Sequence, residues 1–256
     1  MTAARRPLGK LPARHDPRTF RMAAPLARAL PAIPAAVNWA QKVDWPMWGN
    51  DRYGCCTQVG VASAIRTWTG VAQAPVLLTG AQVLNNYAAA TNPPFNVSTG
   101  ANDNGAVEVD VLDRWRVEGF ERPGQTRDYL TAYGAVGPQD AVSARRSIAF
   151  LGGLYIGLSL PEWACVVGCG DWDYSPTRDN SIAGGHCVWL HGYDADWFYL
   201  NTWGDDKRMS AAFMRQFCDE AYGLVSRQNW TTVYGVSVNG EALDALVAEM
   251  RASAGV

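Results

Sequence analysis

The sequence predicts an α+β fold with a mainly helical first lobe over residues 33–150 and a β-rich second lobe over residues 151–256. Two patterns of apolar residues support this division. In the first lobe, apolar residues recur at helical spacing, as at Val59, Ala62, Ile65 and Trp68. After residue 150, short continuous apolar runs such as Leu154–Leu160 indicate buried strands. With 256 residues, of which 48% are hydrophobic, the chain can bury a sizeable core.

Four helices are expected in the first lobe. The first spans Thr57–Trp68 and ends near Gly70. The second opens at Thr79 and runs through Tyr87, because Thr79 and Gln82 have the spacing of a capping box. The third and fourth are expected at Val107–Val117 and Pro138–Phe150, the latter with proline in its first turn.

The second lobe is expected to consist mostly of strands. The clearest are Leu154–Leu160, His186–Tyr193 and Trp197–Trp203, with a loop rich in Gly, Asp and Trp from Pro161 to Gly185. A helix at Ala211–Ala221, strands at Gly223–Ser226 and Thr231–Val238, and an amphipathic helix at Glu241–Ala252 complete the pattern.

Residues 1–32 form a separate Pro-, Arg- and Ala-rich N-terminal arm. Its first 30 residues hold seven Lys or Arg and one acid, although the net charge of the whole chain is −2. A basic arm lying on an acidic body explains this distribution, and docking of the arm to a protein partner is an alternative. Nucleic acid is a weak candidate because the arm has almost no aromatic residue that could stack on bases.

No apolar run reaches the length of a membrane span. The segment 22–37 resembles the apolar part of a signal peptide, but Arg28 and three prolines interrupt it. Six cysteines are too few for a disulfide scaffold in a chain of this length. We therefore expect free thiols and a cytoplasmic location, or carriage in a phage virion.

The stretch 49–62 joins a glycine-punctuated polar loop to two cysteines and directly to the first predicted helix. Cys56 thus falls at or just before a helix N-terminus, where unpaired N–H groups favour a thiolate. A thiolate nucleophile needs a base and a group that orients the base. His186 and Asn201 follow Cys56 by 130 and 145 residues, which is the spacing of papain-like enzymes.

Three short blocks extend this resemblance to the papain family. Residues 33–56 contain an Ile-Pro opening, a Val-x-Trp, a proline ten residues before Cys56 and a glycine two before it. HCVWLHGYD resembles the family's His-Ala-Val-x-x-x-Gly-Tyr strand, and NTWG resembles its Asn-Ser-Trp-Gly. In outline the resemblance covers most of residues 33–204. It implies a papain-like two-lobe fold with an antiparallel second lobe and an active-site cleft between the lobes, in a compact bacterial or phage branch.

The resemblance also implies roles for four residues. Cys56 is the nucleophile, His186 lies within about 3–4.5 Å of its sulfur as the base, and Asn201 holds the far ring nitrogen, shielded by Trp203. Asn50, six residues before Cys56, takes the place of the family's oxyanion-hole Gln but is one methylene shorter. The helix N-terminus and a charged His186 are expected to lower the pKa of Cys56. Such chemistry requires no cofactor and no metal.

Alternatives remain open at each position. Cys55 could be the nucleophile, His191 the base, and Asp194 or Asp196 the orienting group. A zinc site of Cys55, Cys56, His186 and Cys187 would lack any Cys-x-x-Cys spacing. The loop Asn102–Gly105 begins like a calcium loop, but the remaining ligands are missing.

The leading function is a papain-like cysteine hydrolase, a peptidase that cleaves a peptide or protein substrate through an acyl-thioenzyme. One alternative is a papain-fold binding or structural protein, such as a virion component, with weak or no catalysis. Another is a cell-wall amidase of NlpC or CHAP type, although those families place His much closer to Cys. Thr57 stands where papain relatives usually have Trp, which adds to the departure at Asn50.

Overall fold

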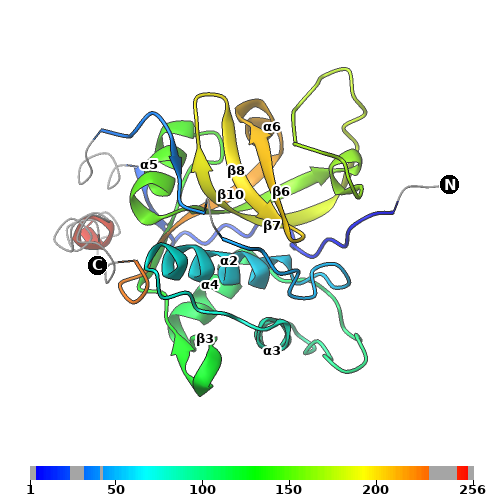
Figure 1. The fold of residues 1–256 in the computed structure, drawn as a ribbon, viewed down its shortest axis with the longest axis vertical. Helices are drawn as coiled ribbons and strands as arrows, with labels where there is room; N and C mark the ends of the chain where they lie inside the picture. Colours follow the sequence, from blue (N-terminus) through cyan, green and yellow to red (C-terminus); the bar gives the residue numbers. More distant parts are fainter. Residues whose placement is uncertain (1–3, 24–31, 41–42, 231–246, 253–256) are drawn as a thin grey trace.

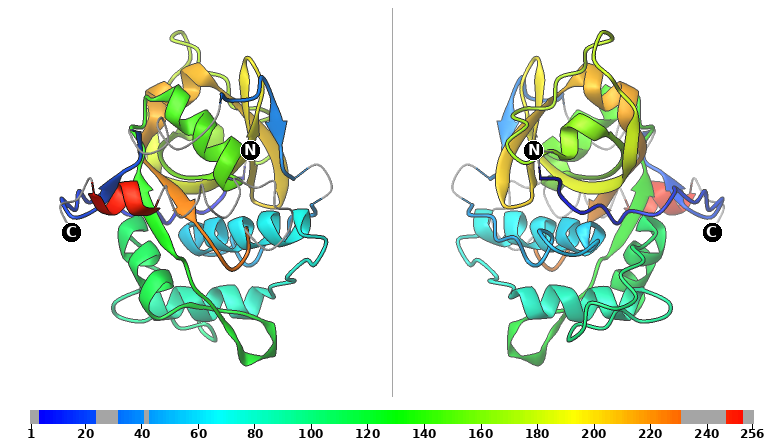
Figure 2. Two further views of the ribbon diagram at one scale, coloured as in Figure 1. Left: turned by 90° about the vertical axis from the view of Figure 1, so that its left-hand side faces the viewer. Right: turned by 90° about the vertical axis from the view of Figure 1, so that its right-hand side faces the viewer.

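The computed structural model describes residues 4–23, 32–40, 43–230 and 247–252. Three helices lie on one side of the molecule: α2 (Cys56–Val71), α3 (Gly80–Ala90) and α4 (Glu108–Val117). A large sheet lies on the other side, with α5 (Ala141–Leu151) and α6 (Ala211–Phe217) packed on it (Figures 1 and 2). This arrangement confirms the predicted α+β, two-lobe architecture.

The large sheet is mostly antiparallel, and its main path runs β1-β5-β10-β6-β7-β8-β9. Only the short pairing of β1 with β5 is parallel among these neighbours. The strands are β1 (Phe20–Arg21), β5 (Ala132–Ala135), β10 (Cys218–Val225), β6 (Leu154–Pro161), β7 (Ile182–Tyr193), β8 (Trp197–Thr202) and β9 (Asp205–Ser210). β2 (Val37–Asn38) pairs with β7, while β3 (Phe120–Glu121) and β4 (Arg127–Asp128) form a separate hairpin. Two short 3-10 turns, η1 (Pro123–Gln125) and η2 (Glu162–Cys165), complete the elements.

Helix α2 is the centre of the fold and is buried on nearly every side. Its Trp68 packs edge-on against Trp189 of β7, with ring centroids 5.5 Å apart, and donates to the Leu151 carbonyl at 2.8 Å. The buried hydroxyls of Ser63 and Thr67 donate to backbone carbonyls one turn earlier, both at 2.8 Å. Such local bonds allow small polar side chains inside a buried helix without unpaired polar atoms.

Most predicted helices and strands are present, although several begin or end at other residues. Strand β7, for example, begins at Ile182, inside the predicted loop Pro161–Gly185. The capping box of Thr79 and Gln82 is confirmed at the start of α3. The fourth helix begins at Ala141 rather than at Pro138, because the Asp140 side chain accepts the Ser143 N–H at 3.0 Å and caps the helix there.

The predicted helix Ala211–Ala221 is wrong beyond Phe217. Residues from Cys218 onward form β10, which pairs with both β5 and β6 in the interior of the sheet. Pairing on two sides satisfies the backbone more fully than one further helical turn would, so tertiary structure overrides the helical spacing. β5 belongs to the same sheet, and the sheet therefore recruits residues from the predicted helical lobe.

The C-terminal predictions are only partly covered. The expected strand Thr231–Val238 lies outside the described residues, as does the first half of the expected helix Glu241–Ala252, whereas residues 247–252 are helical. Among the described residues, no helix is long and apolar enough to cross a membrane.

Candidate active site

Cys56 is the first residue of α2, directly after a tight polar loop. Cys55 occupies the N-cap position without a side-chain cap, and both cysteines are fully buried. The backbone N–H of a residue at this helix position has no partner within the helix. The predicted placement of Cys56 at a helix N-terminus is therefore confirmed. Backbone N–H groups at such a position can stabilise a negative charge.

The N-terminal arm crosses the molecule at Cys56, between the α2 side and the sheet (Figure 2, right). The Gly9 carbonyl accepts from the Ala106 N–H at 2.9 Å, and the Leu11 N–H donates to the Ala106 carbonyl at 3.0 Å. On the other side, the Lys10 N–H donates to the Gly185 carbonyl at 3.0 Å. An extended peptide is thus hydrogen-bonded to both lobes on either side of the thiol.

The glycines of the body make room for this peptide. A side-chain Cβ at Gly105 would overlap the Gly9 carbonyl, and one at Gly185 would overlap the Lys10 carbonyl. Asp103 holds the same region in place by accepting from the Gly54 N–H at 3.0 Å and from the Tyr87 hydroxyl at 2.7 Å. The Asn102–Gly105 loop therefore positions the strand-like edge at Ala106.

The arm is also part of the folded body. Met22 is fully buried, β1 pairs with β5, and Arg5 and Arg14 form ion pairs with Glu162 and Asp110. These contacts match the predicted basic arm on an acidic body. Through them, the arm packs against the rest of the same chain. The alternative of an arm that docks on another protein finds no support here.

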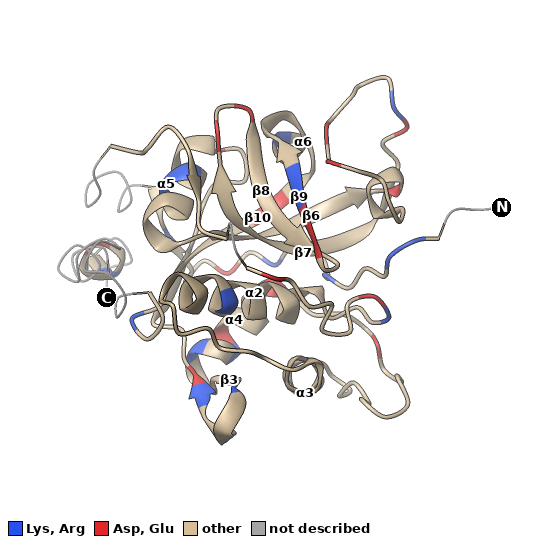
Figure 3. Ribbon diagram, in the orientation of Figure 1, with Lys and Arg blue, Asp and Glu red and all other residues tan. Residues whose placement is uncertain are grey.

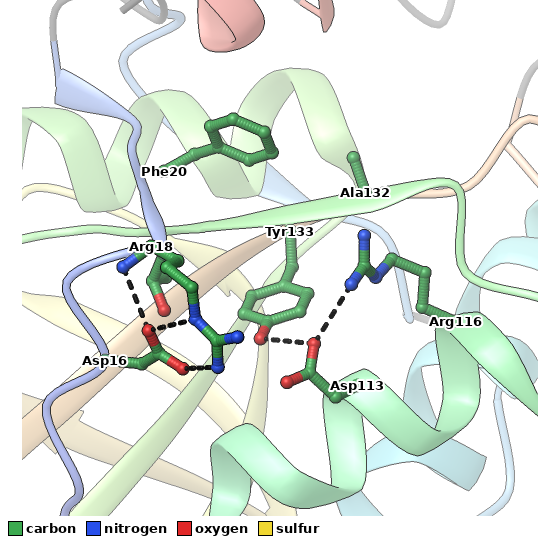
Figure 4. Close-up of a pocket in the computed structure, with 8 residues that line it drawn as sticks. Asp16, Arg18, Phe20, Asp113, Arg116, Ala132 and Tyr133 are labelled. Carbon is green, nitrogen blue, oxygen red and sulfur yellow. Dashed lines mark hydrogen bonds and ion pairs between the residues drawn. The ribbon is translucent and has the colours of Figure 1, made fainter. Parts of the chain in front are cut away.

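A small surface pocket shows a further anchor of the arm (Figure 4). Within it, Asp16 and Arg18 pair with each other at 2.6 Å. Across the pocket, the Tyr133 hydroxyl of β5 donates to Asp113 of α4 at 2.9 Å. Cys56 does not line this pocket. Over the molecule as a whole, charged residues of both signs are spread over the two lobes (Figure 3).

The Cys56 thiol is not activated in this arrangement. Burial raises its pKa to about 11, and the backbone N–H groups of Cys187 and Gly9 oppose that rise only in part. The expected lowering of this pKa is therefore wrong for the closed cleft, because the arm excludes water from the sulfur. The Gly9 N–H faces the sulfur, and the Gly9 carbonyl accepts from the Ala106 N–H.

His186 lies in β7 immediately before Cys187, whose N–H reaches the Cys56 sulfur. Its ring stacks on Trp203 with centroids 4.3 Å apart, and its Nε2 lies 2.8 Å from the Thr202 hydroxyl oxygen. Its Nδ1 has no hydrogen-bond partner among the described residues. The expected separation of about 3–4.5 Å between the ring and the Cys56 sulfur stays a prediction. Burial lowers the pKa of His186 to about 3, so the ring is neutral at pH 7.

The predicted bond from Asn201 to the far nitrogen of His186 is wrong in this structure. Asn201 instead donates from Nδ2 to the Ser63 hydroxyl of α2 at 2.9 Å, and its buried Oδ1 has no partner among the described residues. The neighbouring Thr202 side chain takes the expected place. Adjacent residues of a strand point to opposite faces, so only one of the two can meet the ring.

Asn50 lies in the loop before α2 and is 1% exposed. Its N–H donates to the Met47 carbonyl at 2.9 Å, and its Oδ1 is buried without a hydrogen-bond partner among the described residues. The unpartnered atom is an acceptor, whereas an oxyanion needs a hydrogen-bond donor such as the Asn50 Nδ2 group. Contact of Asn50 with an oxyanion therefore stays a prediction.

The competing residues lie elsewhere. His191 stacks on Trp45 with centroids 5.5 Å apart, and its Nδ1 lies 3.3 Å from Asn38 Oδ1. Asp194 accepts from the Trp197 N–H and the Tyr199 hydroxyl at the turn between β7 and β8. All six cysteines are free, and the described residues contain no group of three or more side chains suited to a metal ion.

Two parts of the site were missed by sequence reasoning. Thr202 was passed over because Asn201 beside it carries the familiar motif. The second part is a group of buried charges: Lys10 of the arm meets Asp219 and Glu220 of β10, with Glu108 of α4 nearby. The only sequence signal for it was the contrast between the basic arm and the acidic body.

Comparison with known structures adds independent evidence on the fold, whereas no protein-family model and no curated protein matches the sequence. Xylellain, a cysteine protease from Xylella fastidiosa, matches with a TM-score of 0.66 and 18% identity over 89% of this chain and 99% of xylellain. The Carica candamarcensis cysteine protease CMS1MS2 matches with a TM-score of 0.56 and 14% identity over 77% of this chain and all of that one. Digestive procathepsin L 3 of Tenebrio molitor matches with a TM-score of 0.57 and 14% identity over 83% of this chain and 75% of that one.

These proteins share little sequence with this chain but share its fold, with TM-scores of 0.56 to 0.66. The chain has the fold of the papain-like cysteine proteases.

Proposed function

We propose that this protein is a papain-like cysteine peptidase with Cys56 as its nucleophile and His186 as its base. One observation carries the proposal: an extended peptide, the N-terminal arm, lies hydrogen-bonded to both lobes across a cysteine at a helix N-terminus. A cleft that holds one peptide in this way is suited to hold another as a substrate. The three protease structures with the same fold add support.

The hydrogen-bond pattern of His186 suits the first step. If Nε2 carries the proton and donates to Thr202, the unpartnered Nδ1 keeps a free lone pair. Once the arm has left, Nδ1 must come within hydrogen-bond reach of the Cys56 thiol, from which it takes the proton as the sulfur attacks a peptide carbonyl. The Cys56 N–H and the Asn50 amide hold the oxyanion, and His186 returns the proton to the leaving amine. Water, deprotonated by His186, then hydrolyses the thioester.

In the structure described here, the arm occupies the cleft and keeps the sulfur protonated. The proposed enzyme is therefore closed in this state, and cleavage requires the arm to leave. Its substrates are peptides or proteins. A cytoplasmic or virion location and a bacterial or phage origin stay predictions.

The test compares the full chain with its Cys56→Ser and Cys55→Ser variants on a fluorogenic peptide set. Each is studied in a Lys10→Glu background, in which the arm is repelled by the acids of β10. We expect turnover that Cys56→Ser abolishes and Cys55→Ser retains, with unchanged circular dichroism. Turnover that survives Cys56→Ser, or a folded Lys10→Glu protein that cleaves nothing, would contradict the proposal.

A further inference from the structure

The arm does not only cross the cleft, since it also fills a side-chain pocket with Lys10. The Lys10 side chain is 1% exposed. Its Nζ lies 2.9 Å from Asp219 Oδ1, 2.9 Å from Glu220 Oε1 and 3.3 Å from the Leu11 carbonyl oxygen. Burial alone would lower the pKa of Lys10, but Glu220, Glu108 and Asp219 together raise it, so the amine is charged.

The pocket is built into the body of the protein. Gly157 of β6 forms one wall, and a Cβ there would overlap Lys10 Cε and lie 2.7 Å from Glu220 Cγ. Asp219 and Glu220 are sequence neighbours that both reach the amine, which regular alternation along a strand would prevent. β10 shifts its register against β6 between Cys218 and Glu220, and this irregularity brings both carboxylates to one place.

The carboxylates of the pocket have partners besides Lys10. The Tyr222 hydroxyl donates to Glu220 Oε2 at 2.8 Å, and the Ser159 hydroxyl donates to Asp219 Oδ2 at 2.9 Å. Glu108 is fully buried at the start of α4 and adds a third carboxyl group. Without a cation, these groups would repel one another in a water-poor site.

The pocket lies one residue from the thiol along the bound peptide. Gly9 faces the Cys56 sulfur with its N–H, and the next residue, Lys10, bonds to the Gly185 carbonyl beside His186. A substrate held by the same backbone edges would place one of its side chains at the same pocket. A substrate side chain that cannot pair with the buried polar groups of such a pocket leaves them without partners. This cost makes the pocket select against that substrate.

We infer that the pocket of Gly157, Asp219 and Glu220 selects a lysine-like cationic side chain in the substrate, and that Lys10 is the resident occupant of this specificity site. This inference rests on the proposed peptidase function. It predicts a preference for positively charged over neutral side chains of the same length. A pocket that serves only to anchor the arm is the competing explanation.

The first measurement does not depend on turnover. Full-length Lys10→Ala, Cys56→Ser protein is titrated with two fluorescein-labelled peptides of the sequence of residues 6–13, one with lysine and one with norleucine at position 10. We expect the lysine peptide to bind on the order of 10–100-fold more tightly, as for a buried charged hydrogen bond. Glu220→Gln should reduce the ratio to a few-fold, whereas the exposed control Glu118→Gln should leave it unchanged.

The second measurement uses the active Lys10→Ala chain and two internally quenched peptide amides of the sequence of residues 6–13, with lysine or norleucine at position 10, so that the variable residue follows glycine as it does in the arm. A similar preference in kcat/KM, lost in Glu220→Gln, supports substrate selection. Equal binding of the two peptides overturns the inference, and selective binding with equal kcat/KM reduces the pocket to an anchor for the arm. If neither amide is cleaved, the proposed peptidase function fails, and the binding ratio still decides whether the pocket selects a cation.

Discussion

The Nε2 atom of His186 lies 2.8 Å from the hydroxyl oxygen of Thr202, while the adjacent Asn201 turns to Ser63 of α2. The group that orients the imidazole in this structure is therefore a hydroxyl. A hydroxyl can both donate and accept, so Thr202 can keep its hydrogen bond to the ring in either protonation state of His186. Because Thr202 and not Asn201 bonds to the ring, substitutions at the two positions should have different effects.

We expect Thr202→Val to lower kcat on the order of 10–100-fold, because a buried ring N–H loses its partner at a cost of roughly 1–3 kcal/mol. Thr202→Ser keeps the hydroxyl and should retain most of the activity. The pH profile of kcat should also shift in Thr202→Val, which mere loosening of the fold would not cause. A full loss in Asn201→Ala with a normal Thr202→Val enzyme would instead assign the orienting role to Asn201.

The arm excludes water from the Cys56 thiol and so contributes to its raised pKa. Lys10→Glu places a like charge beside Asp219 and Glu220 and should release the arm, which lets water reach Cys56. If the pKa of Cys56 falls from about 11 to near 8.5, its thiolate fraction at pH 7 rises on the order of 10²-fold. Alkylation by iodoacetamide, followed by peptide mass spectrometry, measures this change.

Lys207→Glu is the matched control for that experiment. Lys207 donates to the Gly170 carbonyl at 2.6 Å, at a site apart from Lys10, and its replacement should not change the labelling of Cys56. Equal labelling rates in wild type and Lys10→Glu would show that the arm does not govern the thiol.

The buried His191 predicts a loss of stability in acid. Burial lowers its folded-state pKa to about 4, against an unfolded value of about 6.5. Between these values the unfolded chain binds more protons, so stability falls as the pH drops below 6.5. At pH 4.5 this one group costs about 2–3 kcal/mol.

Urea unfolding at pH 7 and pH 4.5 tests this contribution. His191→Gln should reduce the difference in unfolding free energy between the two pH values by about 2 kcal/mol. An unchanged difference would mean that His191 is already charged, or equally accessible to protons, in the folded protein.

Asn50→Ala should lower kcat on the order of 10²-fold, or about 2.7 kcal/mol, with little change in KM, if its amide holds the oxyanion. Asn50→Gln should also lower kcat, because the position is almost fully buried and an added methylene must displace neighbours. The exposed neighbour Asp51 provides the control, since Asp51→Ala should leave kcat unchanged. Normal turnover in both Asn50 variants would remove this residue from the mechanism.

The sequence predicted the parts of the fold that depend on local patterns. Helix α2 and the capping box of Thr79 follow from apolar spacing and a four-residue motif, and both are present. The end of α6 did not follow, because Cys218–Ala221 has helical spacing but finds strand partners that are distant in sequence. At the site, motif spacing identified Cys56 and His186 as candidates but could not tell which side chain of Asn201 and Thr202 faces the ring.

The pairing of Lys10 with Glu220 was beyond sequence reasoning for a related reason. The two residues are far apart in the sequence, and no short motif marks either of them. Their contact depends on where the arm crosses the sheet and on the register shift in β10. Both features depend on contacts between segments that are distant in the sequence.

Trapping of a covalent intermediate shows directly whether Cys56 is the nucleophile of a peptidase. Full-length Lys10→Glu protein is mixed with a lysine-containing peptide p-nitrophenyl ester, quenched in acid within the first turnover, and digested for mass spectrometry. We expect one peptidyl thioester, on the fragment that contains Cys56, which disappears in Cys56→Ser and persists in Cys55→Ser. An adduct on Cys55 alone, or no adduct on a folded protein, would contradict it.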